Sequence, residues 1–176
     1  SKGEYLIDIM NEVGYDIVVP GNHEFDYGME QALKNLNDLD AKVVSCNFVD
    51  LKENKAVFDP YTIVEYGEKK VAYVGMSTPE TYTKSTPTYF QDENGEYIYS
   101  FSEDALYTTV QTSIDAAKAE GVDYVVVIGH MGIDEQSSPW TSREVIANTT
   151  GIDVFIDGHS HSKVENETVA NKDGKD

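Results

Sequence analysis

The chain has 176 residues, of which 40% are hydrophobic and 26% are charged, and its formal net charge is −19. This length and composition are those of a folded domain with its own core, and they exclude a disordered or fibrous chain. No apolar run reaches the roughly 20 residues of a membrane-spanning helix, and so acidic a surface repels nucleic-acid polymers and anionic membranes while it attracts cations.

The first part of the chain predicts two helices and two strands. Apolar residues recur at helical spacing over residues 3–14 and again over residues 28–40. The segments 16–20 (DIVVP) and 41–48 (AKVVSCNF) are short, rich in β-branched residues and almost wholly apolar, which is typical of strands covered on both faces. Cys46 lies in the second of these strands and is expected to be a buried structural thiol.

The middle of the chain predicts a hairpin, a surface excursion and a helix. Residues 61–76 (YTIVEYGEKKVAYVGM) have the pattern of a β-hairpin that turns at residues 67–70. Residues 77–104 are rich in Tyr, Thr, Asp and Glu, so we expect a long surface excursion there. A helix should begin at Ser102 as its N-cap, with an apolar stripe formed by Leu106, Val110, Ile114 and Ala117.

The last part of the chain predicts two further buried strands with a helix between them. The strands are residues 123–129 (DYVVVIG) and 153–157 (DVFID). Thr141 and Glu144 have the spacing of a capping box, which marks the start of the intervening helix. Helices and strands alternate without a linker or a low-complexity tract, so residues 1–176 are expected to form one α/β domain.

All four histidines follow a predicted strand. The segments 14–23 (GYDIVVPGNH), 121–130 (GVDYVVVIGH) and 151–161 (GIDVFIDGHSH) share a pattern of Gly, any residue, Asp, an apolar stretch, then Gly and His. Ligands of α/β proteins bind at the carboxyl ends of the strands. The repeated pattern therefore favours a shared site at one sheet edge over four unrelated histidines that each pack in the core.

The residue types at these strand ends suit a divalent metal ion. Imidazoles and an amide oxygen together bind zinc, manganese, iron and related ions, so the expected ligands are Asn22, His130, His159 and His161. His159 and His161 are one residue apart and would project the same way from an extended segment, toward one metal or two adjacent ones.

His23 follows Asn22 directly and should point away from it, toward a substrate on the metal. Asp26 is placed to hydrogen-bond the His23 ring and to fix its tautomer. An imidazolium held in this way would stabilise developing negative charge or protonate a leaving oxygen, so His23 and Asp26 are the candidate catalytic residues. Glu24 is more simply interpreted as a capping carboxylate, and we leave it out of the site.

The motifs GNHEFDYG (21–28), GHMG (129–132) and GHSHS (158–162) occur in that order. In this the chain resembles the calcineurin-like metallophosphoesterases, and within them the 5′-nucleotidases and 2′,3′-cyclic-nucleotide phosphodiesterases. The resemblance implies a four-layer α/β/β/α sandwich with two metal ions at its strand ends. It implies that Asn22, His130 and His159 ligate the second metal and His161 the first, and that His23 contacts the scissile phosphate and pairs with Asp26.

Two motifs of this family are not in the sequence: a strand that carries Asp-x-His and a strand that ends in Gly-Asp. The second supplies the carboxylate that bridges the two metals, and two cations about 3.5–4 Å apart repel each other without it. We therefore expect a fragment with an incomplete sandwich, without the C-terminal nucleotide-binding domain of the family. It should bind at most one metal weakly, lack significant phosphatase activity alone, and self-associate through exposed sheet edges.

The function expected from the resemblance is hydrolysis of phosphate esters, with nucleotides as substrates and a metal-activated water attacking phosphorus. Two alternatives remain open at this point: a non-catalytic surface or binding module with a vestigial metal site, and another metallophosphoesterase such as a nuclease or a phosphoprotein phosphatase. The habit of the family favours a bacterial protein of nucleotide catabolism outside the cytoplasm.

Overall fold

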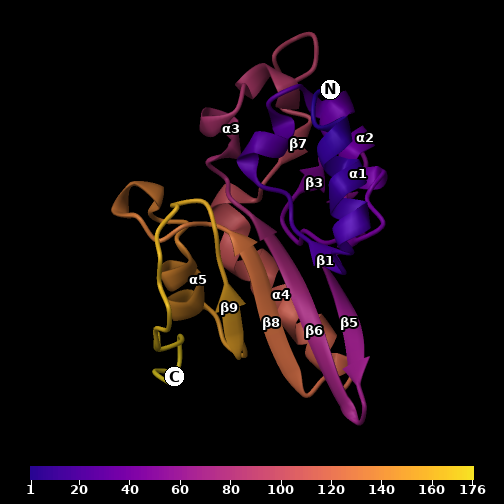
Figure 1. The fold of residues 1–176 in the computed structure, drawn as a ribbon. Coiled ribbons are helices and arrows are strands. Elements are labelled where there is room, and N and C mark those ends of the chain that lie inside the picture. The colour runs from indigo at the N-terminus through magenta and orange to yellow at the C-terminus, as the bar shows by residue number, and fades with distance from the viewer.

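Helices and strands alternate along most of the chain, and the computed structural model describes all residues 1–176 (Figure 1). The helices are α1 (Glu4–Val13), α2 (Met29–Asn37), α3 (Thr81–Lys84), α4 (Leu106–Ala119) and α5 (Ser142–Asn148). The strands are β1 (Ile17–Val18), β2 (Lys42–Val43), β3 (Val49–Asp50), β4 (Lys55–Ala56), β5 (Tyr61–Tyr66), β6 (Lys69–Ser77), β7 (Tyr99–Ser100), β8 (Tyr124–His130) and β9 (Val154–Ile156). The short 3₁₀ turns are η1 (Asn22–Phe25), η2 (Pro87–Phe90), η3 (Glu103–Ala105) and η4 (Glu135–Ser137).

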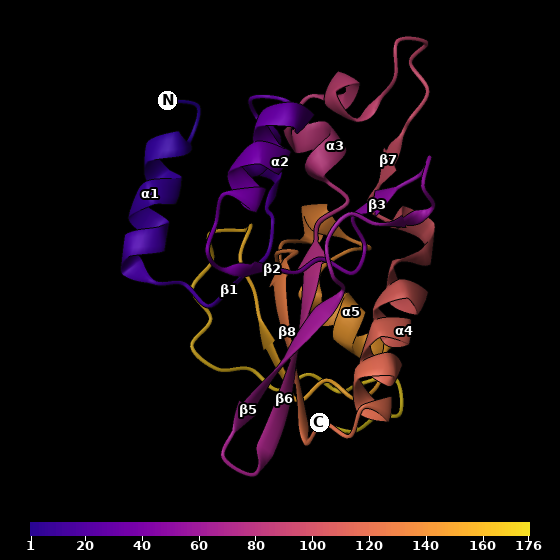
Figure 2. The same ribbon diagram turned by 90° about the vertical axis from the view of Figure 1, so that its right-hand side faces the viewer.

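The largest sheet has four strands in the order β5-β6-β8-β9. The predicted hairpin forms β5 and β6, which are antiparallel, whereas β8 runs parallel to both β6 and β9. Parallel neighbours need a crossover connection, and α4 supplies it between β6 and β8, packing along the sheet as Figure 2 shows. The carboxyl ends of β6, β8 and β9 therefore lie at the same edge.

The main hydrophobic core lies between this sheet and α4. The predicted apolar stripe of α4 is fully confirmed, because all of its members are at most 1% exposed: Leu106, Val110, Ile114 and Ala117. Ser102 is not the N-cap of this helix. Its φ is 59° and its hydroxyl donates to the carbonyl of Asn47, so the turn η3 intervenes and α4 begins four residues later. The predicted capping box of α5 is present, since Thr141 and Glu144 bond each other's backbone N–H groups.

A second core is built from phenylalanines. Phe25, Phe48, Phe90 and Phe101 are all 0% exposed, and the rings of Phe48 and Phe101 stack at 5.0 Å. Two of these residues belong to segment 77–104, so the expectation of a surface excursion is wrong for the parts around Phe90 and Phe101, whereas residues 93–97 are exposed. Tyr, Thr and acidic residues dominate the composition of this segment. Composition alone therefore did not indicate that two of its aromatic side chains pack against η1 and the chain after β2.

The remaining strands are short. β1 and β2 form a parallel pair of two residues each, and β3 pairs antiparallel with β4 and β7. Beyond β2 the chain continues against β6, where the N–H of Cys46 donates to the carbonyl of Gly75 at 2.8 Å. Cys46 is buried as predicted, and burial raises the pKa of its thiol to about 12.

Two apolar surfaces face solvent. On α1, which lies at the edge of the molecule in Figure 2, Leu6, Ile9 and Val13 are each more than half exposed. On β9, Val154 and Ile156 are 50% and 55% exposed. These two residues point to the same face of β9, so the expectation that this strand is covered on both faces is wrong. None of the helices is both long and apolar enough to cross a membrane.

Candidate functional site

Asn22 lies at the centre of the predicted site. After β1 the chain passes through Pro20 and Gly21 into the turn η1. The first residue of η1 is Asn22, which is 3% exposed. Its side-chain oxygen Oδ1 lies 3.0 Å from Nε2 of His130 and 3.1 Å from Nδ1 of His159. Three residues that are far apart in the sequence thus bring one amide oxygen and two imidazole nitrogens together.

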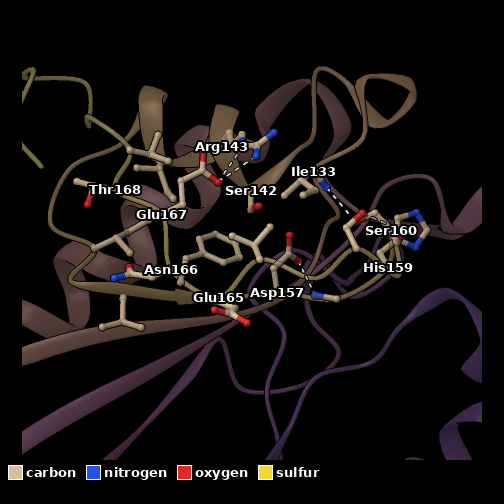
Figure 3. Close-up of a pocket in the computed structure, with 18 of the residues that line it drawn as sticks. Ile133, Ser142, Arg143, Asp157, His159, Ser160, Glu165, Asn166, Glu167 and Thr168 are labelled. Atoms are coloured by element: carbon tan, nitrogen blue, oxygen red, sulfur yellow. Dashed lines mark hydrogen bonds and ion pairs between the residues drawn. The ribbon is translucent and has the colours of Figure 1, made fainter.

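The topology of the large sheet explains why the two imidazoles meet. His130 is the last residue of β8, and His159 follows the parallel neighbour β9 by three residues. Their ring centroids are 5.0 Å apart, with the ring planes at 62°. Figure 3 shows His159 beside Ser160, at one end of the residues that line the neighbouring cavity. The expected convergence of strand ends is therefore present for Asn22, His130 and His159.

Electrostatics keep His130 uncharged at neutral pH. Burial lowers its pKa to about 4, and neighbouring imidazoles add to the effect, His159 most and His23 and His161 less. The carboxylate of Asp157 opposes this shift, but it is itself engaged by the backbone N–H groups of Met131 and Gly158, both at 2.8 Å. A neutral imidazole retains a lone pair, which is the form that binds a metal ion.

Gly21 makes room for the ring of His130. A Cβ atom at this position would lie 2.9 Å from Nε2 of His130 and 2.9 Å from Oε2 of Glu24, closer than any non-bonded carbon can approach. The carboxylate of Glu24 accepts a hydrogen bond from the N–H of Gly21. Glu24 thus makes the capping contact expected from the sequence.

His23 and Asp26 form the pair that the sequence predicts. Nδ1 of His23 lies 2.8 Å from Oδ2 of Asp26, and the two side chains are 71% and 41% exposed. With Nδ1 bonded to the carboxylate, Nε2 is the nitrogen of His23 that remains available to a ligand from solvent.

His161 does not join the Asn22 group. It is exposed and makes no hydrogen bond, although it lies near enough to contribute to the lowered pKa of His130. The argument that His159 and His161 project the same way from an extended segment is wrong. Both residues have positive φ, 80° and 53°, so the backbone turns between them and only His159 reaches Asn22.

Glu80 belongs to the site, and the sequence analysis missed it. Its Oε2 lies 2.9 Å from Nε2 of His159, and the residue is 8% exposed. It follows the end of β6, the next strand of the same sheet. The signal that could have found it was the rule already applied to the histidines, because an acidic residue shortly after a third parallel strand reaches the same edge.

A cavity of about 650 Å³ adjoins the histidine loop. It is bounded by α5, β9 and residues 157–169, and it is lined by both His159 and His161. Figure 3 shows its one cationic side chain, Arg143, paired with Glu167 across the cavity, with Nη2 and Oε2 3.0 Å apart.

The donor set fits a divalent metal ion only when the amide oxygen is included. No group of three or more His, Cys, Asp or Glu side chains is arranged to hold a metal. Asn22 Oδ1, His130 Nε2 and His159 Nδ1 nevertheless converge within 3.1 Å of the amide oxygen, and each is a ligand type that zinc, manganese or iron accepts. Such a set is neutral, which predicts weaker binding than a set that includes a carboxylate.

Most of the chain is similar to known proteins. The family model described as "Bacterial capsule synthesis protein PGA_cap" matches residues 2–173. A 5′-nucleotidase of Bos taurus is 27% identical over 169 residues, covering 92% of this chain and 26% of the relative. The "trifunctional nucleotide phosphoesterase protein YfkN" of Bacillus subtilis is 28% identical over 174 residues, covering 92% of this chain and 11% of the relative.

Solved structures share the fold. The chain superimposes on the sulfate thiohydrolase SoxB of Thermus thermophilus with a TM-score of 0.77 and 26% identity, covering 94% of this chain and 28% of that one. It superimposes on the calcineurin-like phosphoesterase YfkN of Bacillus subtilis with a TM-score of 0.72 and 26% identity, covering 92% of this chain and 50% of that one. The expected α/β class is thus confirmed, and the chain spans about a quarter or less of the length of the curated relatives described above.

Proposed function

Because the chain belongs to the PGA_cap family of metallophosphoesterase-like proteins, we propose that residues 1–176 form part of the catalytic domain of a metal-dependent phosphoric-ester hydrolase that acts on nucleotides. The observation that carries this proposal is the convergence of Asn22, His130 and His159 at one sheet edge. Relatives named nucleotidase or nucleotide phosphoesterase support the substrate class.

In this proposal Asn22 Oδ1, His130 Nε2 and His159 Nδ1 hold one divalent ion, and His161 is available to a neighbouring ion in a longer protein. A bound divalent ion would polarise a phosphoryl oxygen and lower the pKa of a water molecule. A bound metal ion would also offset the repulsion between the acidic chain and an anionic substrate. A chain of net charge −19 repels a phosphate ester, so a local cationic centre is needed to attract one.

His23 acts on the substrate rather than on the metal. Its bond to Asp26 through Nδ1 fixes the orientation of the ring and leaves Nε2 directed outward. A proton on Nε2 can then be donated to a phosphoryl or leaving-group oxygen, which stabilises negative charge as it develops. His23 adjoins Asn22 in η1, so the contact to substrate and the contact to metal are set by the same short turn.

The experiment separates these roles by residue. In the longest natural protein that contains residues 1–176, hydrolysis of AMP, of 2′,3′-cyclic AMP and of bis-p-nitrophenyl phosphate is measured with added Mn²⁺ or Zn²⁺. We expect His130→Ala to lose both metal binding and turnover. We expect His23→Ala to lose about 10²–10⁴-fold in turnover with metal binding kept. Asn94→Ala, in an exposed loop, is the control.

Undiminished turnover in both histidine variants would overturn the proposal. Metal binding without hydrolysis of any of the three substrates would favour the alternative of a non-catalytic binding module. A location outside the cytoplasm, self-association and inactivity of the isolated 176-residue chain stay predictions.

A further inference from the structure

Glu80 is buried beside one of the proposed ligands and has no part in the function described so far. Its side chain is 9% exposed, and that of its partner His159 is 10% exposed. A buried carboxylate is unfavourable unless it is paired and hydrogen-bonded. Glu80 meets this condition through Oε2, which lies 2.9 Å from His159 Nε2, while Oε1 has only a loose ion pair, 3.8 Å from Nζ of Lys84.

The backbone around Glu80 fixes where its carboxylate points. The N–H of Glu80 donates to Oγ1 of Thr78 at 3.1 Å, and the hydroxyl of Thr81 donates to the carbonyl of Thr78 at 2.6 Å. The carbonyl of Glu80 in turn accepts the N–H of Lys84 at 2.8 Å. Thr78 and Thr81 are each fully buried, so the turn between β6 and α3 is a rigid support rather than a loose loop.

The contact with Glu80 determines which nitrogen of His159 carries the proton. An ionised carboxylate can only accept hydrogen bonds, so Nε2 of His159 must be the donor. In a neutral ring the lone pair then lies on Nδ1, and Nδ1 is the atom that lies 3.1 Å from Asn22 Oδ1. Two lone pairs thus face each other, an arrangement that a cation between them would satisfy.

We propose that Glu80 is a positioning residue that holds His159 in its Nε2–H tautomer, with the lone pair of Nδ1 directed at Asn22. In a neutral ring the tautomer follows from the hydrogen bond to Glu80, while its use in metal binding rests on the function proposed above. Carboxylate partners of metal-binding histidines elsewhere act in this way, and their removal typically weakens metal affinity about 10–100-fold.

The test observes the tautomer directly in the metal-free chain. Two-bond ¹H–¹⁵N correlation spectra of the ¹⁵N-labelled 176-residue chain at pH 8 distinguish Nε2–H, Nδ1–H and doubly protonated rings. We expect His159 to be the Nε2–H tautomer in the wild type and in Glu80→Gln, whose side-chain oxygen still accepts the proton. We expect Glu80→Ala to populate both neutral tautomers. Glu93→Ala, in an exposed turn, should match the wild type.

Titration of the same samples with Zn²⁺ supplies the second measurement. We expect the dissociation constant to rise about 10–100-fold in Glu80→Ala and much less in Glu80→Gln. The positioning role is overturned if wild-type His159 is the Nδ1–H tautomer or doubly protonated, or if Glu80→Ala leaves its tautomer unchanged. Should Glu80→Ala fail to fold, the wild-type spectrum alone still overturns the proposal if His159 is not the Nε2–H tautomer.

The two proposals fail in different ways. If Zn²⁺ binds nowhere near His159 in the wild type while the tautomer responds to Glu80→Ala as expected, the metal-dependent function fails and the control of the tautomer by Glu80 stands. If Zn²⁺ binds at Asn22, His130 and His159 with the same affinity in the wild type and in Glu80→Ala, the positioning role fails and the metal site stands.

Discussion

The histidines divide into an inner pair, His130 and His159, and an outer pair, His23 and His161. The inner pair shares the oxygen of Asn22, and the side chain of His159 is 10% exposed. The outer pair faces solvent, with His23 71% exposed and bonded only to Asp26. All four lie at or shortly after the end of a strand, in the same sequence pattern. The end of a strand therefore places a histidine near the site. Whether its side chain is buried there depends on contacts with residues that follow other strands.

The largest expected effect comes from removing the oxygen that joins the inner pair. Asn22→Ala deletes a buried amide and leaves the imidazoles of His130 and His159 without their shared partner. We expect Zn²⁺ affinity to fall at least tenfold and the free energy of unfolding to fall by about 2–3 kcal/mol. Calorimetric titration and urea unfolding measure the two quantities, with Asn94→Ala as the control; equal values in the two variants would contradict the account.

A second substitution perturbs the inner pair by crowding it, without removing any of its atoms. Gly21 has φ −95° and ψ −175°, a conformation that alanine adopts freely, so Gly21→Ala acts only through its Cβ, which would lie 2.9 Å from His130 Nε2. We expect a loss of about 2 kcal/mol in unfolding free energy and displaced imidazole signals of His130.

The matched control for that substitution is Gly95→Ala. Gly95 has a φ of 80° and no atom within 4 Å of its Cβ position. The change should therefore destabilise the chain by about 1 kcal/mol through backbone strain alone, with the histidine signals unmoved. Unmoved His130 signals in Gly21→Ala would show that the ring is not held against Gly21.

The metal-free chain should lose stability in mild acid because of His130. Burial lowers the folded-state pKa of this ring from 6.5 to about 4. Between pH 4 and pH 6.5 the ring is therefore protonated in the unfolded chain but not in the folded chain. The stabilisation is present above pH 6.5 and is lost as the pH falls toward 4. Since the ring is only half-buried, we expect about 1 kcal/mol.

Urea unfolding at several pH values measures this loss, and His130→Gln should flatten the profile between pH 6.5 and 4. His23→Gln should leave it as steep as in the wild type. An equally steep profile in His130→Gln would assign the acid sensitivity to another group.

The smallest effects are expected in the outer pair. His23→Ala and His161→Ala remove exposed side chains, so the free energy of unfolding should change by less than about 0.5 kcal/mol. Zn²⁺ affinity at the inner pair should change less than twofold in each variant. A tenfold loss of affinity in His161→Ala would place His161 with the inner pair after all.

Much of the fold followed from local patterns. The stripe of α4 and the capping box of α5 were predictable because each depends on residues within one element. The burial of Phe90 and Phe101 was not, since their partners Phe25 and Phe48 come from distant segments. The exposure of β9 was also missed, because its composition is that of a covered strand although it lies at a sheet edge.

The same distinction applies to the site. Asn22, His130 and His159 could be predicted because each lies at or shortly after the end of a recognisable strand. Glu80 escaped because it follows β6 within a segment that was interpreted as surface. The position of His161 depended on the φ of His159, a backbone angle that the alternation rule for extended chains cannot anticipate.

The central claim is that Asn22, His130 and His159 together bind a divalent metal ion. Anomalous diffraction at the zinc edge, from crystals of the 176-residue chain grown with Zn²⁺, tests it most directly. The account predicts one peak about 2.0–2.2 Å from His130 Nε2, His159 Nδ1 and Asn22 Oδ1. Zinc bound only at the outer histidines or at surface carboxylates, with the two inner rings still in contact with the Asn22 amide, would contradict it.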